Sequence, residues 1–361
     1  MVGHNWIGIL QPRDASKPAQ PGGCVLCHAG LGAKPNPVGK LTDADYGNID
    51  CLLCHAPGYK RTVVKEGDKL RIAPDPSIDV LKAAQSVGKP TNDMCLRCHA
   101  LAGGGPNHKH GVTPTKGSDV HVAKGMQCFD CHTVRKHKVA GGSDLKAQEL
   151  LDVKVACENC HSATHKGGKA KILDRHAARI ACQTCHIPAI ARDPGMPTAV
   201  ERDWTRPVLN EKTGLYGPAN KMAGNVRPEY AWWNRFMKVP PEPAGSIADP
   251  KSKIYPWKRT VYTVIADAAT EKPIYIKSGV YAVTGDPGAA AKRGAEDGKQ
   301  SYSGDWKGIR ETMVFSMNHQ VAPKSEALKC ESCHGPDGIL DFRKLGYAEE
   351  KVRKMSGTPS R

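Results

Sequence analysis

The residues of this chain that are best suited to chemistry are its cysteines, which occur in pairs, each followed at once by a histidine. The 361-residue chain has 14 cysteines, and every one belongs to a Cys-x-x-Cys-His unit. This unit is the attachment motif of c-type haem. Each sulfur forms a thioether bond with the haem, and the histidine approaches the iron as an axial ligand. We therefore predict seven covalently attached haem c groups. The attaching cysteines are Cys24, Cys27, Cys51, Cys54, Cys95, Cys98, Cys128, Cys131, Cys157, Cys160, Cys182, Cys185, Cys330 and Cys333. The axial histidines of the same motifs are His28, His55, His99, His132, His161, His186 and His334.

Zinc sites and disulfides are the alternative uses of paired cysteines. A structural zinc site takes four ligands, usually from two cysteine pairs or from one pair and two spaced histidines. Neither a zinc site nor a disulfide between pairs explains why a histidine follows every pair at once. The pattern therefore favours haem over both alternatives.

Histidines outside the motifs are the candidates for the second axial ligand of each iron. The chain has 15 histidines, so the seven motifs leave eight. His108 and His110 share one short loop, and we expect only one of them, His110, to bind iron. The nine methionines show no comparable pattern, which disfavours methionine ligation. The predicted distal ligands are His4, His110, His121, His137, His165, His176 and His319.

The elements that position these residues are expected to be short. Only 39% of the residues are hydrophobic and 6% aromatic, which is low for a chain of this length. Porphyrin rings are expected to fill the interior instead. We predict a mainly α and irregular multihaem cytochrome c fold, with short helices and loops around a haem stack. The spacing of apolar residues predicts helices over Ser77–Val87, Asp144–Ala156 and Lys169–Cys182. A small β-hairpin region is expected in the C-terminal half, from Arg259–Asp267 and Lys272–Thr284.

The motifs are unevenly distributed along the chain. Six lie before residue 190, none lies in 191–329, and the last begins at Cys330. We therefore predict a haem-dense region over 1–190, a haem-free region with the hairpin over 191–329, and a region over 330–361 that carries the seventh haem and a C-terminal helix packing back on the haem stack. The aromatic segment Tyr230–Phe236 is either a local core or a patch that faces a haem or another subunit.

The net charge of +16 is lower in the haem-loaded protein. Each ferric haem with two ionised propionates contributes about one negative charge, so seven reduce the net charge to about +9. This argues against nucleic acid as a partner and favours redox partner proteins. Haem c is attached after export, so we expect a periplasmic or extracellular location. No signal peptide is recognisable in Met1–Leu10, and no apolar run is long enough for a transmembrane segment. We expect the export signal to be absent from this chain.

Four strings resemble the octahaem tetrathionate reductase-like cytochromes, and together they extend over nearly the whole chain. They are Cys51–Lys60, Asp119–His137, Ile180–Pro188 and Asn318–Cys330. The resemblance implies a haem arrangement similar to that of hydroxylamine oxidoreductase and multihaem nitrite reductases.

The chain departs from this family in three respects. The family has eight haems, and the absent one is its first, which would precede His4. The family also has a non-haem cysteine near its active site, and this chain has no cysteine to spare. In the family a lysine is the distal ligand of the active-site haem, and the resemblance places Lys60 in that role on the haem of Cys24 and Cys27. The family's acidic residue before this lysine is replaced within Ala56–Gly58.

Two functions follow from these features. The first is electron transfer through closely packed, mostly bis-histidine haems. The second is reduction of a small inorganic substrate such as tetrathionate, nitrite or hydroxylamine at a Lys60-ligated or open haem. Whether the chain is an enzyme is left open by its sequence. Seven distal histidines and Lys60 exceed the number of haems by one, and the spare ligand is either free or serves a neighbouring subunit in a self-associated or multihaem complex.

Overall fold

The computed structural model describes residues 30, 40, 42–66, 69–100, 113–135, 137–141, 155–238 and 242–357. The chain divides into two compact units, and each is considered by itself. The first unit is made of Met1–Gly105, Met126–Ser143 and Gln148–Asn159. The second unit is made of Pro106–Gly125, Asp144–Ala147 and Cys160–Arg361. The predicted helix over Asp144–Ala156 falls almost entirely outside the described residues, and the division by haem content at residues 190 and 329 stays a prediction.

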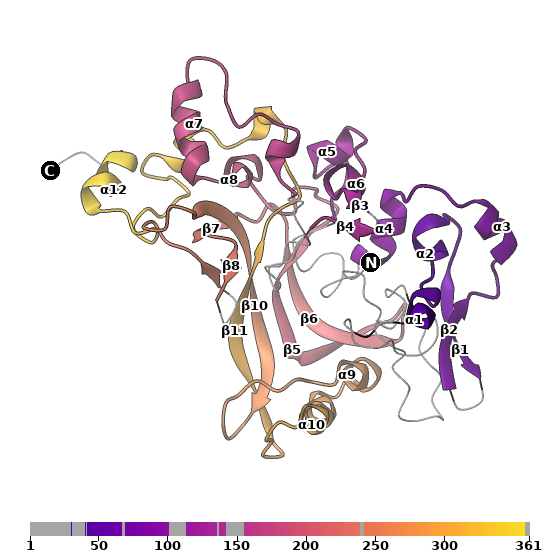
Figure 1. The fold of residues 1–361 in the computed structure, drawn as a ribbon. Coiled ribbons are helices and arrows are strands. Elements are labelled where there is room, and N and C mark those ends of the chain that lie inside the picture. The colour runs from indigo at the N-terminus through magenta and orange to yellow at the C-terminus, as the bar shows by residue number, and fades with distance from the viewer. Residues whose placement is uncertain are drawn as a thin grey trace. The chain divides into compact units, whose positions relative to one another are not determined.

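The first unit consists of short helices and two small hairpins (Figure 1). Its helices are α1 (Asp43–Gly47), α2 (Leu52–His55), α3 (Val80–Gln85), α4 (Asn92–His99) and α6 (Cys128–Cys131), with a 3-10 turn over Cys157–Asn159. Its strands are β1 (Arg61–Glu66), β2 (Lys69–Pro74), β3 (Val134–Arg135) and β4 (Lys138–Val139). β1 pairs with β2 and β3 with β4, both antiparallel. Helix α3 lies within the predicted Ser77–Val87 helix, where the Asp79 side chain caps its first turn.

The second unit combines short helices with a large sheet. Its helices are α5 (Val120–Ala123), α7 (Ala170–Arg179), α8 (Cys182–His186), α9 (Ser278–Thr284), α10 (Pro287–Gly298), α11 (Cys330–Cys333) and α12 (Glu349–Met355), with a 3-10 turn over Lys324–Glu326. Its strands are β5 (Thr198–Asn210), β6 (Leu215–Ala223), β7 (Glu229–Trp233), β8 (Phe236–Met237), β9 (Pro243–Ala244), β10 (Lys253–Asp267) and β11 (Trp306–Ser316). Helix α7 begins and ends within the predicted Lys169–Cys182 helix.

The large sheet has five strands in the order β11–β10–β5–β6, with β7 also paired to β10. β10 pairs antiparallel with β11 along eleven residues and parallel with β5 along three. Ten residues of β10 are buried rather than every second one, which indicates that both faces of this strand are covered. Pro207 lies opposite Pro218 where the register of β5 and β6 shifts, which is a position that tolerates proline in a sheet. Helices α9 and α10 pack against β6 and β5 respectively (Figure 1).

The predicted hairpin is formed only at its closed end. Ala266 of β10 forms an antiparallel bridge with Pro273, but the long antiparallel partner of β10 is β11, and the rest of Lys272–Thr284 is not a strand. Residues 278–284 form helix α9, although the segment is rich in β-branched and aromatic residues. Tyr281 is 1% exposed and packs its ring 5.2 Å from that of Trp204, so burial of this helix face overrides strand propensity. The C-terminal half is therefore a mixed sheet with helices rather than a mainly irregular region with a small hairpin.

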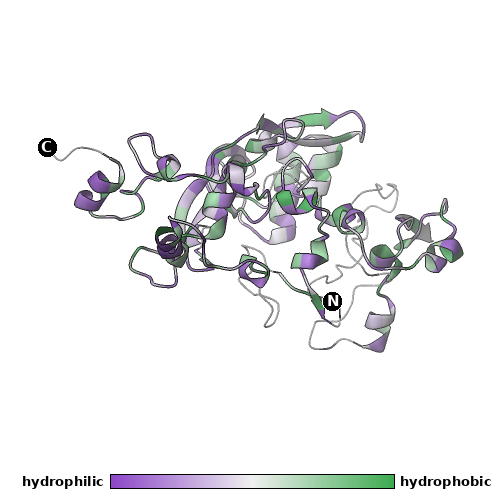
Figure 2. Ribbon diagram, turned by 90° about the horizontal axis from the view of Figure 1, so that it is seen from above, coloured by the Kyte–Doolittle hydropathy of each residue, from purple (hydrophilic) through white to green (hydrophobic). Residues whose placement is uncertain are grey.

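The core of the second unit is built from side chains. Trp232 packs in one cluster with Ile254, Phe342 and neighbours from the C-terminal segment. Trp257 packs with Tyr255 and Val314, and Trp233 lies against this second cluster. The local-core interpretation of Tyr230–Phe236 agrees with these contacts, although Phe236 itself is 62% exposed. Hydrophobic and hydrophilic residues are mixed along the helices and strands (Figure 2). Within the described segments, no helix is both long and apolar enough to cross a membrane.

Candidate haem-attachment sites

All six motifs that the structure describes lie on a single helical turn. The turns are α2, the C-terminal half of α4, α6, the 3-10 turn at Cys157, α8 and α11. In a helix, residues i, i+3 and i+4 lie on one face, so the two sulfurs and the imidazole of each motif point the same way. The turn is closed by backbone bonds such as His132 N–H to Cys128 O at 2.9 Å and His334 N–H to Cys330 O at 2.8 Å. No disulfide joins any of the twelve cysteines in the described segments.

Backbone or carboxylate oxygens hold the Nδ1 side of several rings. Nδ1 lies 2.9 Å from a carbonyl oxygen in His55, His132 and His176, whose partners are Gly88, Ala140 and Ile172. Nδ1 of His334 lies 3.3 Å from the Met355 carbonyl oxygen. In two distal candidates Nδ1 faces a carboxylate oxygen instead. Nδ1 of His121 lies 3.2 Å from Oδ1 of Asp119, and Nδ1 of His165 lies 2.8 Å from Oδ1 of Asp174. A fixed Nδ1–H leaves Nε2 as the ligating nitrogen, which is the usual arrangement of metal-binding histidine.

Three distal candidates each lie opposite a motif histidine. The ring centres of His55 and His137 are 6.2 Å apart, those of His121 and His161 are 6.1 Å apart, and those of His176 and His334 are 6.1 Å apart. Bonds of about 2.0 Å from a metal to each imidazole nitrogen put two ring centres about 6.3 Å apart across that metal. The three pairs therefore have the separation that one haem iron between two axial imidazoles requires, and the residues fit a bis-histidine haem.

The backbone at one distal candidate is strained. His137 has φ of 59°, in the left-handed region that few non-glycine residues adopt. It lies between β3 and β4, five residues after His132 of the fourth motif. Strain of this kind persists where the surrounding structure imposes it, and it concentrates at functional sites.

Motifs of the first unit lie beside one another. The thiols of Cys95 and Cys128 share a hydrogen bond, which raises the pKa of Cys95 and lowers that of Cys128 to about 7. Burial raises the pKa of Cys54, and Cys95 raises it further. Arg97, within the third motif, donates to the carbonyl oxygens of Leu53, Ala56, Pro57 and Tyr59. The second, third and fourth motifs thus form one group.

Motifs of the second unit form another group. Burial raises the pKa of Cys333, and the nearby Cys185 and Cys330 raise it further. Burial lowers the pKa of His186, with smaller contributions from the rings of His165 and His161. The sixth and seventh motifs are therefore neighbours in this unit, and His161 of the fifth motif lies near the sixth.

The sheet of the second unit anchors the sixth motif and the segment that carries His319. Ala181 N–H and Thr184 Oγ1 both donate to the Ile254 carbonyl oxygen, at 3.0 and 2.8 Å. Tyr255 OH donates to the Met317 carbonyl oxygen at 3.1 Å. Because Ile254 and Tyr255 are adjacent in β10, one end of this strand positions both ligand-bearing segments.

Lys60 is exposed and sits beside a buried polar group that the sequence did not reveal. Asp50, 4% exposed, lies 3.7 Å from the Arg61 guanidinium, which is 1% exposed. Burial raises the pKa of Tyr59, and its hydrogen bond to Asp50 raises it further. Asp50 directly precedes the second motif, and that position is the only signal for it in the sequence. The predicted partners of Lys60, Cys24 and Cys27, lie outside the described residues, as do His4, His28, His108 and His110.

The remaining predicted ligands occupy varied environments. His99 has its pKa lowered by burial and by the nearby His132 ring. His165 is held by Asp174 at the solvent-exposed face of α7, where both side chains are 39% exposed. His319 is exposed in the segment after β11. Asp119 and Asp174 are supporting residues that the search for ligands missed, because no spacing rule relates a carboxylate to the ring it orients.

Comparisons with known proteins agree with this geometry. A family model described as bacterial cytochrome c matches residues 206–337. The crystal structure of octaheme cytochrome c from Shewanella oneidensis is 30% identical and superimposes with a TM-score of 0.71, over 94% of this chain and 83% of that one. This chain belongs to the multihaem cytochrome c family. Its cofactor is covalently bound haem c.

An uncharacterized protein of Archaeoglobus fulgidus is also similar. It is 29% identical over 169 residues, which are 38% of this chain and 56% of that protein. The chain therefore matches little more than half the length of that relative.

Proposed function

We propose that this multihaem cytochrome conducts electrons through seven haem c groups that are mostly bis-histidine ligated. Haem c, when bound, supplies an iron that alternates between ferric and ferrous states by one electron. The observation that carries the proposal is the set of three ring pairs at 6.1–6.2 Å. His137 would ligate the haem of Cys51 and Cys54, His121 that of Cys157 and Cys160, and His176 that of Cys330 and Cys333. An iron with two imidazoles has no position left for a substrate.

Close packing of the motifs supports conduction. The shared hydrogen bond of Cys95 and Cys128, and the proximity of Cys185 to Cys330, bring successive attachment turns together within each unit. His4, His110, His165 and His319 are the distal ligands that we propose for other haems. Because haem c is attached outside the cytoplasm, the protein would act in the periplasm or outside the cell, where a redox partner protein supplies and removes electrons.

Haem content and iron spin state test this proposal. We expect seven haems by intact mass and pyridine haemochrome absorbance, and only low-spin signals in the ferric EPR spectrum. A His137→Ala variant should convert one low-spin haem to high spin, whereas Lys138→Ala, its charged neighbour in sequence, should not. A high-spin haem in the wild-type protein would contradict conduction through closed irons.

The buried group beside Lys60 favours reduction of a small inorganic substrate as the second candidate. Asp50 and Tyr59 are ionisable, buried and hydrogen-bonded, which suits a relay of protons to a substrate on the haem of Cys24 and Cys27. Turnover of tetrathionate, nitrite and hydroxylamine with reduced viologen tests it. Activity that is lost in Lys60→Leu would support a reductase, and no turnover of all three would exclude these substrates.

A further inference from the structure

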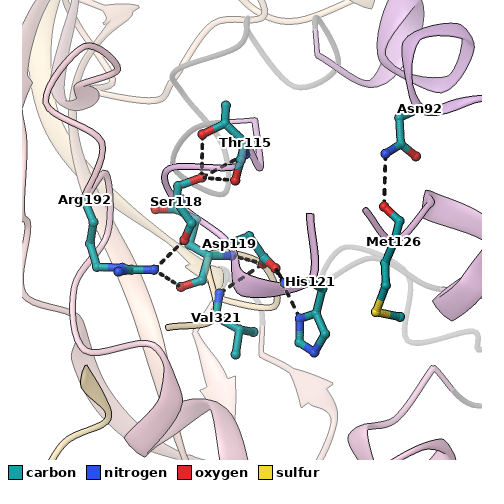
Figure 3. A network of polar contacts seen from close by, with 9 residues as sticks. Asn92, Thr115, Ser118, Asp119, His121, Met126, Arg192 and Val321 are labelled. Atoms are coloured by element: carbon teal, nitrogen blue, oxygen red, sulfur yellow. Dashed lines mark hydrogen bonds and ion pairs between the residues drawn. The ribbon is translucent and has the colours of Figure 1, made fainter. Parts of the chain in front are cut away.

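The carboxylate of Asp119 contacts one predicted distal ligand and the backbone that directly follows another (Figure 3). Its Oδ1 accepts the backbone N–H of His121 at 2.9 Å and faces the Nδ1 of the same ring at 3.2 Å. Its Oδ2 accepts the N–H groups of Gln320 and Val321 at 2.7 and 3.0 Å. These two residues directly follow His319. The Asp119 side chain is only 5% exposed, so its charge is weakly screened by water.

The backbone at Gln320, which Asp119 holds, is strained and is fixed by several further hydrogen bonds. Gln320 is fully buried with φ of 73°, and its Oε1 accepts the N–H of Ala191 at 2.7 Å. Ala191 itself has φ of 58°. Arg192 donates to the carbonyl oxygen of Ser118 (Figure 3). It also donates to that of Gln320 and pairs with Glu326 at 2.8 Å. Strained residues held by so many contacts indicate that the position of the 318–321 segment matters to the protein.

The partner of Nδ1 separates His121 from two other distal candidates, His176 and His165. His176 faces the neutral carbonyl of Ile172, and the Asp174 carboxylate at His165 is 39% exposed. A carboxylate that accepts the Nδ1 proton increases the electron donation of the imidazole to the metal. Greater donation stabilises ferric over ferrous iron, and a buried carboxylate does this more strongly than an exposed one or a carbonyl.

We propose that Asp119 is a positioning residue that lowers the reduction potential of the haem at Cys157 and Cys160 through His121 and fixes the direction of His319. The inference rests on the proposed ligation by both histidines. The redox step is the one-electron change between ferric and ferrous iron, with the electron supplied by the electrode in the test below, and no bond is made or broken. Asp119 thereby lowers the potential of one haem and ties its ligand to the segment that carries the ligand of a second haem.

The test is spectroelectrochemical titration and EPR of the haem-loaded full chain, comparing Asp119→Asn with Asp193→Asn. Asp193 accepts from Thr115 and Gly195 in the same region but contacts no histidine, so it controls for the loss of one charge. We expect Asp119→Asn to raise the midpoint potential of one haem and to change two low-spin EPR signals. Asp193→Asn should do neither.

Each outcome decides a separate claim. Identical titrations and spectra for wild type and Asp119→Asn, with equal haem content, would overturn the role of Asp119 and leave conduction intact. Absence of bis-histidine signals from the wild type would overturn the proposed function, and the role of Asp119 with it. If Asp119→Asn loses haem, the Asp119→Glu variant provides the test. The proposal predicts that Asp119→Glu keeps a low potential like that of the wild type and has altered EPR signals. An unchanged EPR spectrum of Asp119→Glu would overturn the proposal.

Discussion

The two compact units bury very different amounts of apolar side chain. Among the described residues, the first unit has one small buried cluster, formed by Leu53, Ala56, Tyr59 and Ala83. The second unit has four clusters, two of which contain buried tryptophans. Both units nevertheless carry neighbouring haem motifs. The second unit therefore has a protein core that exists beside its haems, whereas the described part of the first is held together mainly by polar contacts and the haems themselves.

The two units therefore position their haem motifs by different kinds of contact. In the second unit, β10 fixes the sixth motif by bonds from Ala181 and Thr184 to one carbonyl oxygen. His334 of the seventh motif stacks on the buried Phe342 at 5.6 Å. In the first unit, Arg97 connects the third motif to the second by bonds to four carbonyl oxygens. Bonds of this kind align segments, but most of the free energy of folding comes from apolar burial, which here the porphyrins must supply.

Removal of a haem from the first unit should have the largest effect on the stability of its unit. In the full chain with Cys95→Ala and Cys98→Ala, we expect amide hydrogen exchange in α2, α4 and α6 to approach the rate of an unfolded chain. The pair Cys330→Ala and Cys333→Ala is the matched comparison, and α12 should keep much of its protection because Val352 packs in the Trp232 cluster. Equal loss of protection in both variants would contradict the contrast between the units.

A cavity in the sheet should have a smaller effect, confined to the second unit. Trp257 is 1% exposed, so Trp257→Ala should lower the free energy of unfolding by about 3–5 kcal/mol. Hydrogen exchange should accelerate in β10 and β11 and stay unchanged in α2 and α4. Trp257→Phe is the conservative control and should lose less. Faster exchange in the first unit of the alanine variant would show that its stability depends on the sheet.

The smallest expected effect is a dependence of the second unit's stability on pH. Burial, together with a smaller contribution from the neighbouring Arg202, lowers the pKa of Lys258 to about 7. Unfolded lysine keeps its proton up to about pH 10.4, so the unfolded chain binds more protons between these values. Stability of the second unit should rise with pH across this window, by at most about 1.4 kcal/mol per pH unit, and fall as pH decreases towards 7. Lys258→Met should remove this slope from a series of denaturant midpoints, and an unchanged slope would place its origin elsewhere.

Local chemistry was predictable from the sequence, and long-range pairing was not. The Cys-x-x-Cys-His spacing implies both the cofactor and the helical turn, because both depend on residues within one turn. The identity of the distal partner depends on the tertiary fold. His137 is five residues from His132, yet its ring faces that of His55. The sheet illustrates the same limit, since Arg259–Asp267 was recognised as a strand but its partner β11 begins only at Trp306.

Supporting residues were harder still to predict. Asp50 has no distinguishing pattern in the sequence, and Asp119 was marked only as the first residue of one of the family-like strings, although both lie within two residues of a motif or a predicted ligand. Their importance comes from burial, at 4% and 5% side-chain exposure, and burial is a property of the folded chain. Lys60, by contrast, was selected by resemblance alone, and in the structure it is exposed.

The arrangement of β10 and β11 also implies an order in which parts of the chain fold. Read from its N-terminus, the chain presents Cys182 before any strand of the large sheet and Cys330 only after the last one. Leu328 N–H bonds to the Cys185 carbonyl oxygen at 2.9 Å, so the seventh motif docks against the sixth only when about 140 intervening residues have closed into a sheet. Closure of such non-local contacts is slow compared with formation of a helical turn. Docking of the seventh motif against the sixth is thus expected to be a late step in folding.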